Sequence, residues 1–262
     1  MNHGPQIMGI LNITPDSFYD GEKKLTEQTL LSKILEIKKS DIIDIGCESS
    51  RPGANPITVD EEIKRFDKII PFLDHFDNIK LSIDTYKYEV AKYAVNHGIS
   101  MINDITAGTH NIKIFNLVSN HDLEIVLMHM QGNPRNMQLK PQYESIIDEM
   151  LVFFSARIDL ALKAGIKEER IIIDPGIGFG KSLNDNIEII KNIEIFKKLG
   201  FKVLLGHSRK TFLQHDSNTP KERFSASIGL SAYAAMKGVD IIRVHDVDDT
   251  RSMLNTINKL TI

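Results

Sequence analysis

The sequence predicts an α/β protein of the (β/α)8 TIM barrel class, built as a single domain over residues 1–262. Short runs rich in Ile, Val and Leu occur eight times, and each is followed by a segment whose apolar residues recur at helical spacing. The runs begin about 33 residues apart on average, which is the spacing of βα units that close into a barrel. A doubly wound open sheet is the alternative, and it would usually need fewer strands.

The eight runs are almost continuously apolar, which is typical of strands that are covered on both faces. The first reads QIMGILN and the sixth reads RIIIDP. The expected strands cover residues 6–12, 41–46, 80–85, 99–105, 124–129, 170–175, 202–208 and 240–246.

The segments between the runs have the pattern of amphipathic helices. Met150, Phe154 and Ile158 lie on one stripe of the segment 143–164. Gly165 follows this segment at the position where a left-handed helix cap favours glycine. The expected helices cover residues 25–39, 58–75, 87–97, 111–119, 143–164, 183–199, 220–237 and 247–260.

Composition excludes several classes of protein. The net charge of −3 and the pI of about 6.3 argue against a nucleic-acid surface, which needs clustered Lys and Arg. The single cysteine, Cys47, can form neither an intrachain disulfide nor a zinc site, and its use fits a reducing compartment. The first residues do not read as a secretory signal, and no apolar run approaches the ~20 residues of a membrane helix. We therefore expect a cytoplasmic protein without nucleic-acid or membrane partners.

Polar residues follow nearly every expected strand. Helix N-capping could explain a single Asp, Asn or Ser at such a place, but it does not explain cationic side chains there. In a barrel the carboxyl ends of the strands converge on one mouth, where a binding site is built. The residues are Asn12, Asp44, Glu48, Asp84, Asn103, His129, Asp174, Ser208, Lys210, Arg243 and His245.

Eight motifs lie at these strand ends. They are MGILNITPDSFYDG (8–21), DIGCESSRPGANP (44–56), SIDTYKYEVA (82–91), INDI (102–105), LMHMQGNP (127–134), DPGIGFGK (174–181), GHSRK (206–210) and IIRVHDV (241–247). In this order and at these spacings the chain resembles the dihydropteroate synthase family from Met8 to about Val247. The segment GIGFGKS also looks like a phosphate-binding P-loop, but only three residues separate Gly176 from Gly180, and a P-loop needs four.

The resemblance implies an enzyme of folate biosynthesis that joins a dihydropterin carrying a hydroxymethyl diphosphate to p-aminobenzoate and releases diphosphate. It implies Mg²⁺ as cofactor, small-molecule substrates and a homodimer. By resemblance, the pterin would be bound by Asp84, Asn103, Met128, Asp174, Phe179, Lys210 and Arg243.

The resemblance also assigns the charged groups of the reaction. Asp84, Lys210, Arg51 and Arg243 would be catalytic. Arg51, Arg243 and His245 would supply donors to the departing diphosphate, with Mg²⁺ held near Asn12.

A site for p-aminobenzoate would form when the loops at about 13–24 and 46–57 close over the mouth. Ser208 would bind the carboxylate of p-aminobenzoate, and sulfonamides would mimic this substrate. The loop residues brought together would be Asp16, Phe18, Ser50, Arg51 and Pro52.

The chain departs from the family pattern at Cys47 and Glu22, where glycine is common, and at Ser50, where threonine is common. Three other functions stay open from sequence alone. They are the methyltetrahydrofolate-binding domain of a corrinoid methyltransferase, a catalytically silent partner subunit, and a Schiff-base aldolase that uses Lys210.

Overall fold

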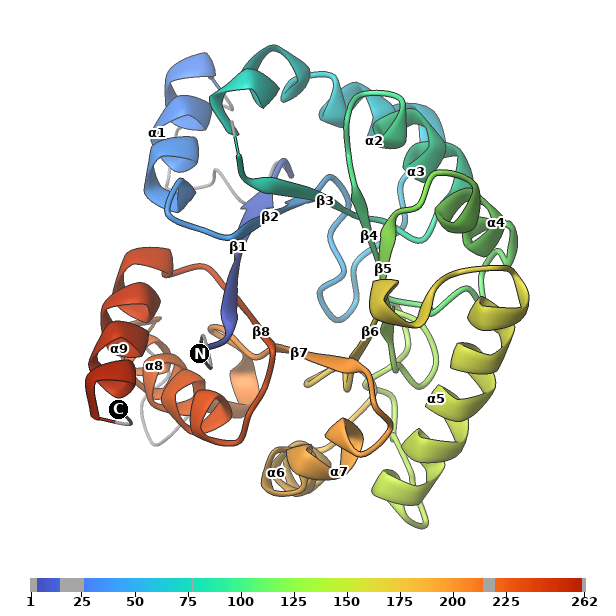
Figure 1. The fold of residues 1–262 in the computed structure, drawn as a ribbon, viewed down its shortest axis with the longest axis vertical. Coiled ribbons are helices and arrows are strands. Elements are labelled where there is room, and N and C mark those ends of the chain that lie inside the picture. The colour runs from blue at the N-terminus through green and yellow to red at the C-terminus, as the bar shows by residue number, and fades with distance from the viewer. Residues whose placement is uncertain (1–3, 15–25, 77, 214–219, 261–262) are drawn as a thin grey trace.

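The computed structural model describes residues 4–14, 26–76, 78–213 and 220–260. Its eight strands form a closed parallel barrel in which each strand pairs with the next along the chain and the last with the first (Figure 1). The predicted TIM barrel is confirmed. The strands are β1 (Gln6–Asn12), β2 (Ile42–Gly46), β3 (Lys80–Asp84), β4 (Met101–Asp104), β5 (Glu124–Met128), β6 (Ile171–Asp174), β7 (Lys202–Gly206) and β8 (Ile241–Val244).

Helices surround the barrel (Figure 1). None within the described ranges is long and apolar enough to cross a membrane. The α-helices are α1 (Glu27–Ile37), α2 (Val59–Phe66), α3 (Tyr88–Val95), α4 (Lys113–Asn120), α5 (Ile146–Lys163), α6 (Leu183–Lys191), α7 (Ile193–Lys197), α8 (Pro220–Met236) and α9 (Val247–Leu260); the 3-10 helices are η2 (Ile70–Phe76), η3 (Glu168–Arg170) and η4 (Thr211–Leu213).

Two expected helices are divided in the structure. The segment 58–75 is α2 followed by η2, and Pro71 has no N–H with which to continue the α-helical hydrogen bonds to the carbonyl of Asp67. The segment 183–199 is divided at Asn192, where the backbone leaves the helical region. The Asn192 side chain donates to the carbonyl of Glu188 at 2.9 Å, which competes with the helical hydrogen bonds of the backbone.

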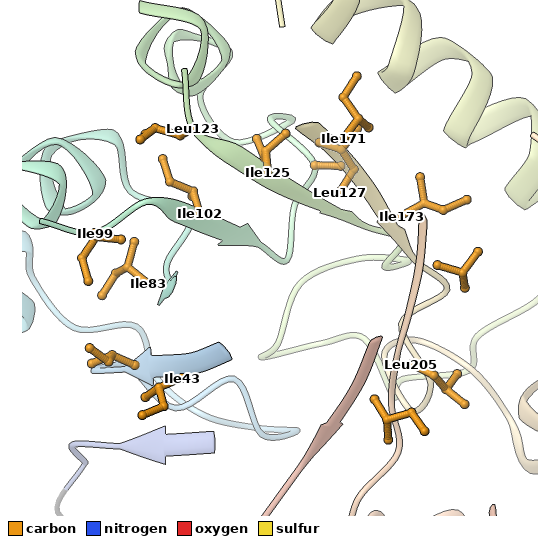
Figure 2. Packing of buried hydrophobic residues seen from close by; sticks show 14 of the residues in the cluster. Ile43, Ile83, Ile99, Ile102, Leu123, Ile125, Leu127, Ile171, Ile173 and Leu205 are labelled. Atoms are coloured by element: carbon orange, nitrogen blue, oxygen red, sulfur yellow. The ribbon is translucent and has the colours of Figure 1, made fainter. Parts of the chain in front are cut away.

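The main core lies between the strands and the helices. Figure 2 shows Ile83, Ile102, Ile125 and Ile173 of this layer as sticks on their strands. Phe154 of α5 belongs to the same cluster and is fully buried.

A second, smaller core fills the inside of the barrel. Side chains alternate between the two faces of a strand, so residues two positions apart point the same way. This inner cluster consists of Met8, Ile42, Met101, Val126, Ile172, Leu204 and Ile241. This cluster fills the barrel interior. On each strand the next inward-facing position lies two residues closer to the carboxyl end, and these positions form the floor of the mouth.

Candidate active site

The inward positions above the inner core are polar on most strands. Asp44 follows Ile42, and Asn103 follows Met101, each two residues on. Because side chains alternate along a strand, these polar groups share the barrel interior with the apolar layer and point toward its open end. The same relation holds for Met128, Asp174, Gly206 and Arg243.

Strand register aligns four residues near the strand ends in one row. Asn12 pairs with Gly46, Gly46 with Asp84, and Asp84 with Asn103. A Cβ atom on Gly46 would lie 2.8 Å from Asn12 Oδ1 and 3.8 Å from Asp84 Oδ2. The absent side chain at this position therefore leaves an amide oxygen and a carboxylate oxygen bordering the same space.

Asp44 holds the floor of the mouth together. Its carboxylate is fully buried and accepts from Ser82 Oγ at 2.6 Å, from Asn103 Nδ2 at 2.9 Å and from Arg243 Nε at 2.6 Å. Arg243 also donates through Nη2 to Asp84 at 2.8 Å. The sequence predicts Asp44 at a strand end but does not reveal its role, because its partners are 38 to 199 residues away in the chain.

Asn103 presents an unused acceptor. Its amide nitrogen is bound by Asp44, and its Oδ1 is buried with no hydrogen-bond partner in the described part of the chain. An unpaired buried acceptor costs about 1–3 kcal/mol, so such an atom in a mouth points to a ligand that donates.

Burial controls the charge of Asp84. It raises the pKa of the Asp84 carboxyl to about 7, against the opposing effect of the Arg243 guanidinium, and the negative Asp44 and Glu62 add to the rise. Asp44 and Glu62 therefore make the surroundings of Asp84 more negative, which a cation would relieve.

Asp174 lies across the mouth from Asp84. Its Oδ1 accepts from the Gly176 N–H at 2.8 Å, and burial raises the pKa of its carboxyl. A Cβ atom on Gly206 would lie 3.8 Å from both Asp174 Oδ2 and Arg243 Cδ. Because Gly206 has no side chain, a gap remains between the Asp174 carboxylate and the Arg243 side chain. A gap of this shape suits a flat ring.

The segment 176–180, whose spacing is one residue shorter than that of a P-loop, is held in place by hydrogen bonds that its carbonyl groups accept. The left-handed backbone of Gly176 brings it so close to β5 that a Cβ atom would lie 2.1 Å from the His129 carbonyl. Every carbonyl of the segment accepts a hydrogen bond. The donors are the Phe179 N–H to Gly176, Lys210 to Ile177, Gln138 to Gly178, Lys181 to Phe179 and Tyr143 to Gly180.

Two lysines border this segment. Lys210 Nζ lies 4.1 Å from the centre of the Phe179 ring, and Lys181 Nζ donates to the His129 carbonyl at 3.1 Å. Burial lowers the pKa of both ammonium groups to about 7, opposed in each case by Asp174. Sequence reasoning missed Lys181, Gln138 and Tyr143, although the run GFGK contains the first of them.

A cationic corner lies beside β8. His245 Nδ1 is 3.1 Å from Ser208 Oγ, which also accepts from the His245 backbone N–H at 3.2 Å. Burial lowers the pKa of His245 to about 3, and the positive Arg209, Arg243 and Arg51 add to the effect. His245 is therefore a neutral donor in a positive field.

The second loop carries Ser50, Arg51 and Pro52. Ser50 is half-buried, and the other two are exposed. The Gly53 N–H donates to the carbonyl of Pro134 at 2.9 Å, which joins this loop to the one after β5. Phe18 and Asp16 of the first loop lie outside the described residues.

Two strand-end residues point away from the mouth. The ring of His129 packs in an aromatic cluster, 4.9 Å from the ring of Phe153. His129 is therefore not among the strand-end side chains that meet at the mouth. Cys47 is fully buried in the main core, and burial raises the pKa of its thiol above the usual range. Its bulk is accommodated in the core and not in the mouth.

Comparisons with known proteins identify similar chains. The family described as pterin binding enzyme matches residues 8–245. A dihydropteroate synthase of Synechocystis sp. is 42% identical over 246 residues, which are 92% of this chain and 85% of that protein. A dihydropteroate synthase of Bacillus subtilis is 39% identical over 257 residues, which are 97% of this chain and 88% of that protein.

Solved structures match the barrel over nearly its whole length. The Yersinia pestis dihydropteroate synthase with a sulfonamide drug has a TM-score of 0.91 and 34% identity, covering 98% of this chain and 94% of that one. The Xanthomonas albilineans dihydropteroate synthase with 4-aminobenzoic acid has a TM-score of 0.90 and 36% identity, covering 98% and 93%.

Proposed function

The chain belongs to the pterin binding enzymes and, within them, to the dihydropteroate synthases, and from this premise we propose how its residues carry out the reaction. The enzyme transfers a dihydropterin-methyl group from its diphosphate to p-aminobenzoate, giving dihydropteroate and diphosphate. The amine nitrogen forms a bond to the methylene carbon, the C–O bond breaks with its electron pair on diphosphate, and the amine loses a proton. This membership favours the synthase over the corrinoid, silent-subunit and aldolase hypotheses.

The pterin ring is oriented by acceptors and donors in one plane. Asp174 accepts two parallel N–H bonds from the ring, which fixes its orientation as well as contributing affinity. Asn103 Oδ1 is the further acceptor, and its lack of a partner among the described residues supports this role. Lys210 donates to the ring carbonyl, and Met128 and Phe179 supply apolar walls.

Charge complementarity accounts for the bond-breaking step. As the C–O bond breaks, positive charge grows on the pterin methylene, and the buried Asp84 stabilises it. Negative charge grows on diphosphate, where Arg51, Arg243 and His245 donate. Groups held in place before the reaction stabilise such charges without reorganising during it.

Mg²⁺ fits the same end of the mouth. Asn12 Oδ1 faces the space that Gly46 leaves, beside Asp84. Mg²⁺ commonly takes one or two protein oxygens and fills its other positions with water and substrate phosphates, so a single amide oxygen suits it. We propose that Asn12 holds the ion, which would neutralise charge on the diphosphate.

The p-aminobenzoate site is assigned to the second loop and its surroundings. Ser50, Arg51 and Pro52 of this loop, together with Phe18 of the first, would enclose the ring. Ser208 would bind the carboxylate, and its Oγ also contacts Nδ1 of His245. Closure of the loops would exclude water, which competes with the amine for the cation.

We also propose a homodimer that works in the cytoplasm. Met236 and Tyr233 of α8 and Leu260 of α9 are exposed apolar side chains on neighbouring helices, which suits a contact between copies. The single, buried Cys47 suits a reducing compartment. Light scattering that gives the 29.6 kDa monomer mass at micromolar concentration would refute the dimer.

The observation that carries the site assignment is Asn103 Oδ1, which has no partner in the described part of the chain and lies in a mouth that Asp174 and Arg243 also border. The test has two parts. Chromatography should detect dihydropteroate when the protein is given the pterin diphosphate, labelled p-aminobenzoate and Mg²⁺. Calorimetry should find that Asp174→Asn loses pterin binding, because one acceptor becomes a donor; unchanged affinity would refute the assignment. Sulfonamides should bind only when diphosphate or the pterin substrate is present.

A further inference from the structure

A buried lysine joins two carboxylates at the root of the second loop. Lys87 Nζ donates to Glu62 at 2.6 Å and also to Glu48. Glu62 is fully buried and Lys87 is 8% exposed. Glu48 lies two residues after the end of β2, in the loop that carries Ser50 and Arg51, whereas Glu62 belongs to α2.

The turn after β3 supplies every partner of these two carboxylates that the described residues include. Thr85 Oγ1 donates to Glu62 at 2.7 Å, and Tyr86 Oη donates to Glu48 at 3.1 Å. Lys87 is the third consecutive residue to bind them. All three directly follow Asp84 in the chain, so the second loop is joined to the segment that places the Asp84 carboxylate.

The loop is fixed at both ends. Arg65 of α2 donates to the carbonyl of Cys47 at 3.0 Å, next to Glu48, and Gly53 is bound to Pro134 at the far end. Only residues 49–52 lie between Glu48 and Gly53. A cavity of about 10 Å³, room for about one water molecule, borders Ser50, Glu48, Glu62 and Asp84. The second loop therefore lies next to Asp84, the carboxylate that is proposed to stabilise positive charge on the pterin.

A gain in stability does not explain why two carboxylates and a lysine are buried together. Two carboxylates and one ammonium in the interior keep a net negative charge, and burial raises the pKa of Glu62. Apolar residues of similar volume in place of a buried ion pair are often neutral or stabilising. Directional charged contacts do fix geometry, because each bond is satisfied in only one arrangement.

We propose that Glu48, Lys87 and Glu62 are positioning residues that hold the second loop at a set place relative to Asp84, so that Ser50 and Arg51 meet p-aminobenzoate beside the reacting carbon. The proposal rests on the proposed function. None of the three belongs to the residues proposed to bind the pterin ring. They act on the second substrate through the loop, and pterin binding depends on Asn103 and Asp174 elsewhere in the mouth.

Two mild variants test this without leaving an unpaired buried charge. Tyr86→Phe removes one donor to Glu48, and Glu48→Gln leaves the Lys87–Glu62 pair intact. We expect the KM for p-aminobenzoate to rise about 3-fold in the first and about 10-fold or more in the second, since small misplacements of binding groups are costly. The Kd for the pterin substrate should stay within 2-fold of wild type in both.

Tyr93→Phe of α3 is the matched control, because its hydroxyl also donates to a carboxylate, that of Asp67 at 2.8 Å, but on the exposed surface. It should leave both constants unchanged. A wild-type KM in Glu48→Gln, or an equal loss of pterin and p-aminobenzoate binding, would overturn the proposal. Failure of the proposed function itself would instead be seen as a wild-type protein that forms no dihydropteroate.

Discussion

Asp44→Asn is the substitution that tests most directly whether the barrel floor is built as described. The Asp44 carboxylate is fully buried and faces three donors, from Ser82, Asn103 and Arg243. Asparagine has the same shape but replaces one acceptor with an NH₂ group. At least one of the three donors must then lose its partner, and the guanidinium loses a neutralising charge.

The magnitude follows from these contacts. Removing one partner of a buried ion pair costs about 3–5 kcal/mol. Arg243 keeps its bond to Asp84, so we expect the lower end, a loss of about 3 kcal/mol in the free energy of unfolding. For a domain of this size that loss lowers the melting temperature by roughly 6–12 °C. Pterin affinity should fall as well, because Asn103 and Arg243 lose the group that orients them.

The matched control lies at the other end of the same strand. Asp41 also accepts from an arginine, Arg251, at 2.7 Å, and from the Ile7 N–H at 2.7 Å, but its side chain is 33% exposed. Solvent weakens such a pair, so Asp41→Asn should cost about 1 kcal/mol. Urea unfolding followed by circular dichroism measures both variants. Equal losses, or a loss below about 1 kcal/mol for Asp44→Asn, would refute the reasoning.

Three further predictions concern single groups of the mouth. Lys210→Met should lower kcat/KM by about 10²–10³-fold while the melting temperature changes little; steady-state kinetics with a thermal melt decides, and activity within a few-fold of wild type would contradict it. Tyr143→Phe removes the donor to the Gly180 carbonyl and should lower the free energy of unfolding by about 1–2 kcal/mol in urea, whereas no change would mean that the segment does not need this contact. His245 has a pKa of about 3 when folded and about 6.5 when unfolded, so only the unfolded chain gains its proton as pH falls through this window. Relative to His245→Asn, the wild type should therefore lose stability below pH 6.5, by at most about 1.4 kcal/mol per pH unit, and parallel pH profiles would contradict the assignment.

The fold could be predicted because each βα unit has the same local pattern. The run 124–129 is apolar from Ile125 to Met128, and the helix after it shows a stripe through Met150, Phe154 and Ile158. Both features arise from residues that are close in sequence, so no long-range information is needed to detect them. The break at Asn192 was missed because its cause is one side-chain hydrogen bond within a segment of good helical periodicity.

The sequence indicates which residues lie near the mouth but not how their side chains are arranged there. Asp84 and Asn103 were expected there from their places at strand ends, and the register does pair them. His129 was expected in the same set, but it lies one position beyond the inward-facing Met128, and its ring turns to the aromatic cluster. One residue decides which side of a strand a side chain occupies, and strand ends are the least certain feature of a sequence-based prediction.

The bonds of the two buried lysines explain why the site stays open to a ligand. Lys210 and Lys181 donate to backbone carbonyls of the segment 176–180 or its neighbour β5, and no described contact joins either of them to Asp174. The one hydrogen bond described for the Asp174 carboxylate comes from the Gly176 N–H and uses Oδ1. A lysine that collapsed onto Asp174 would satisfy both groups and remove the acceptor that the pterin needs. The carbonyls of this segment hold the cations a few ångströms away, so the carboxylate keeps its capacity for a ligand at a cost in stability, as binding sites commonly do.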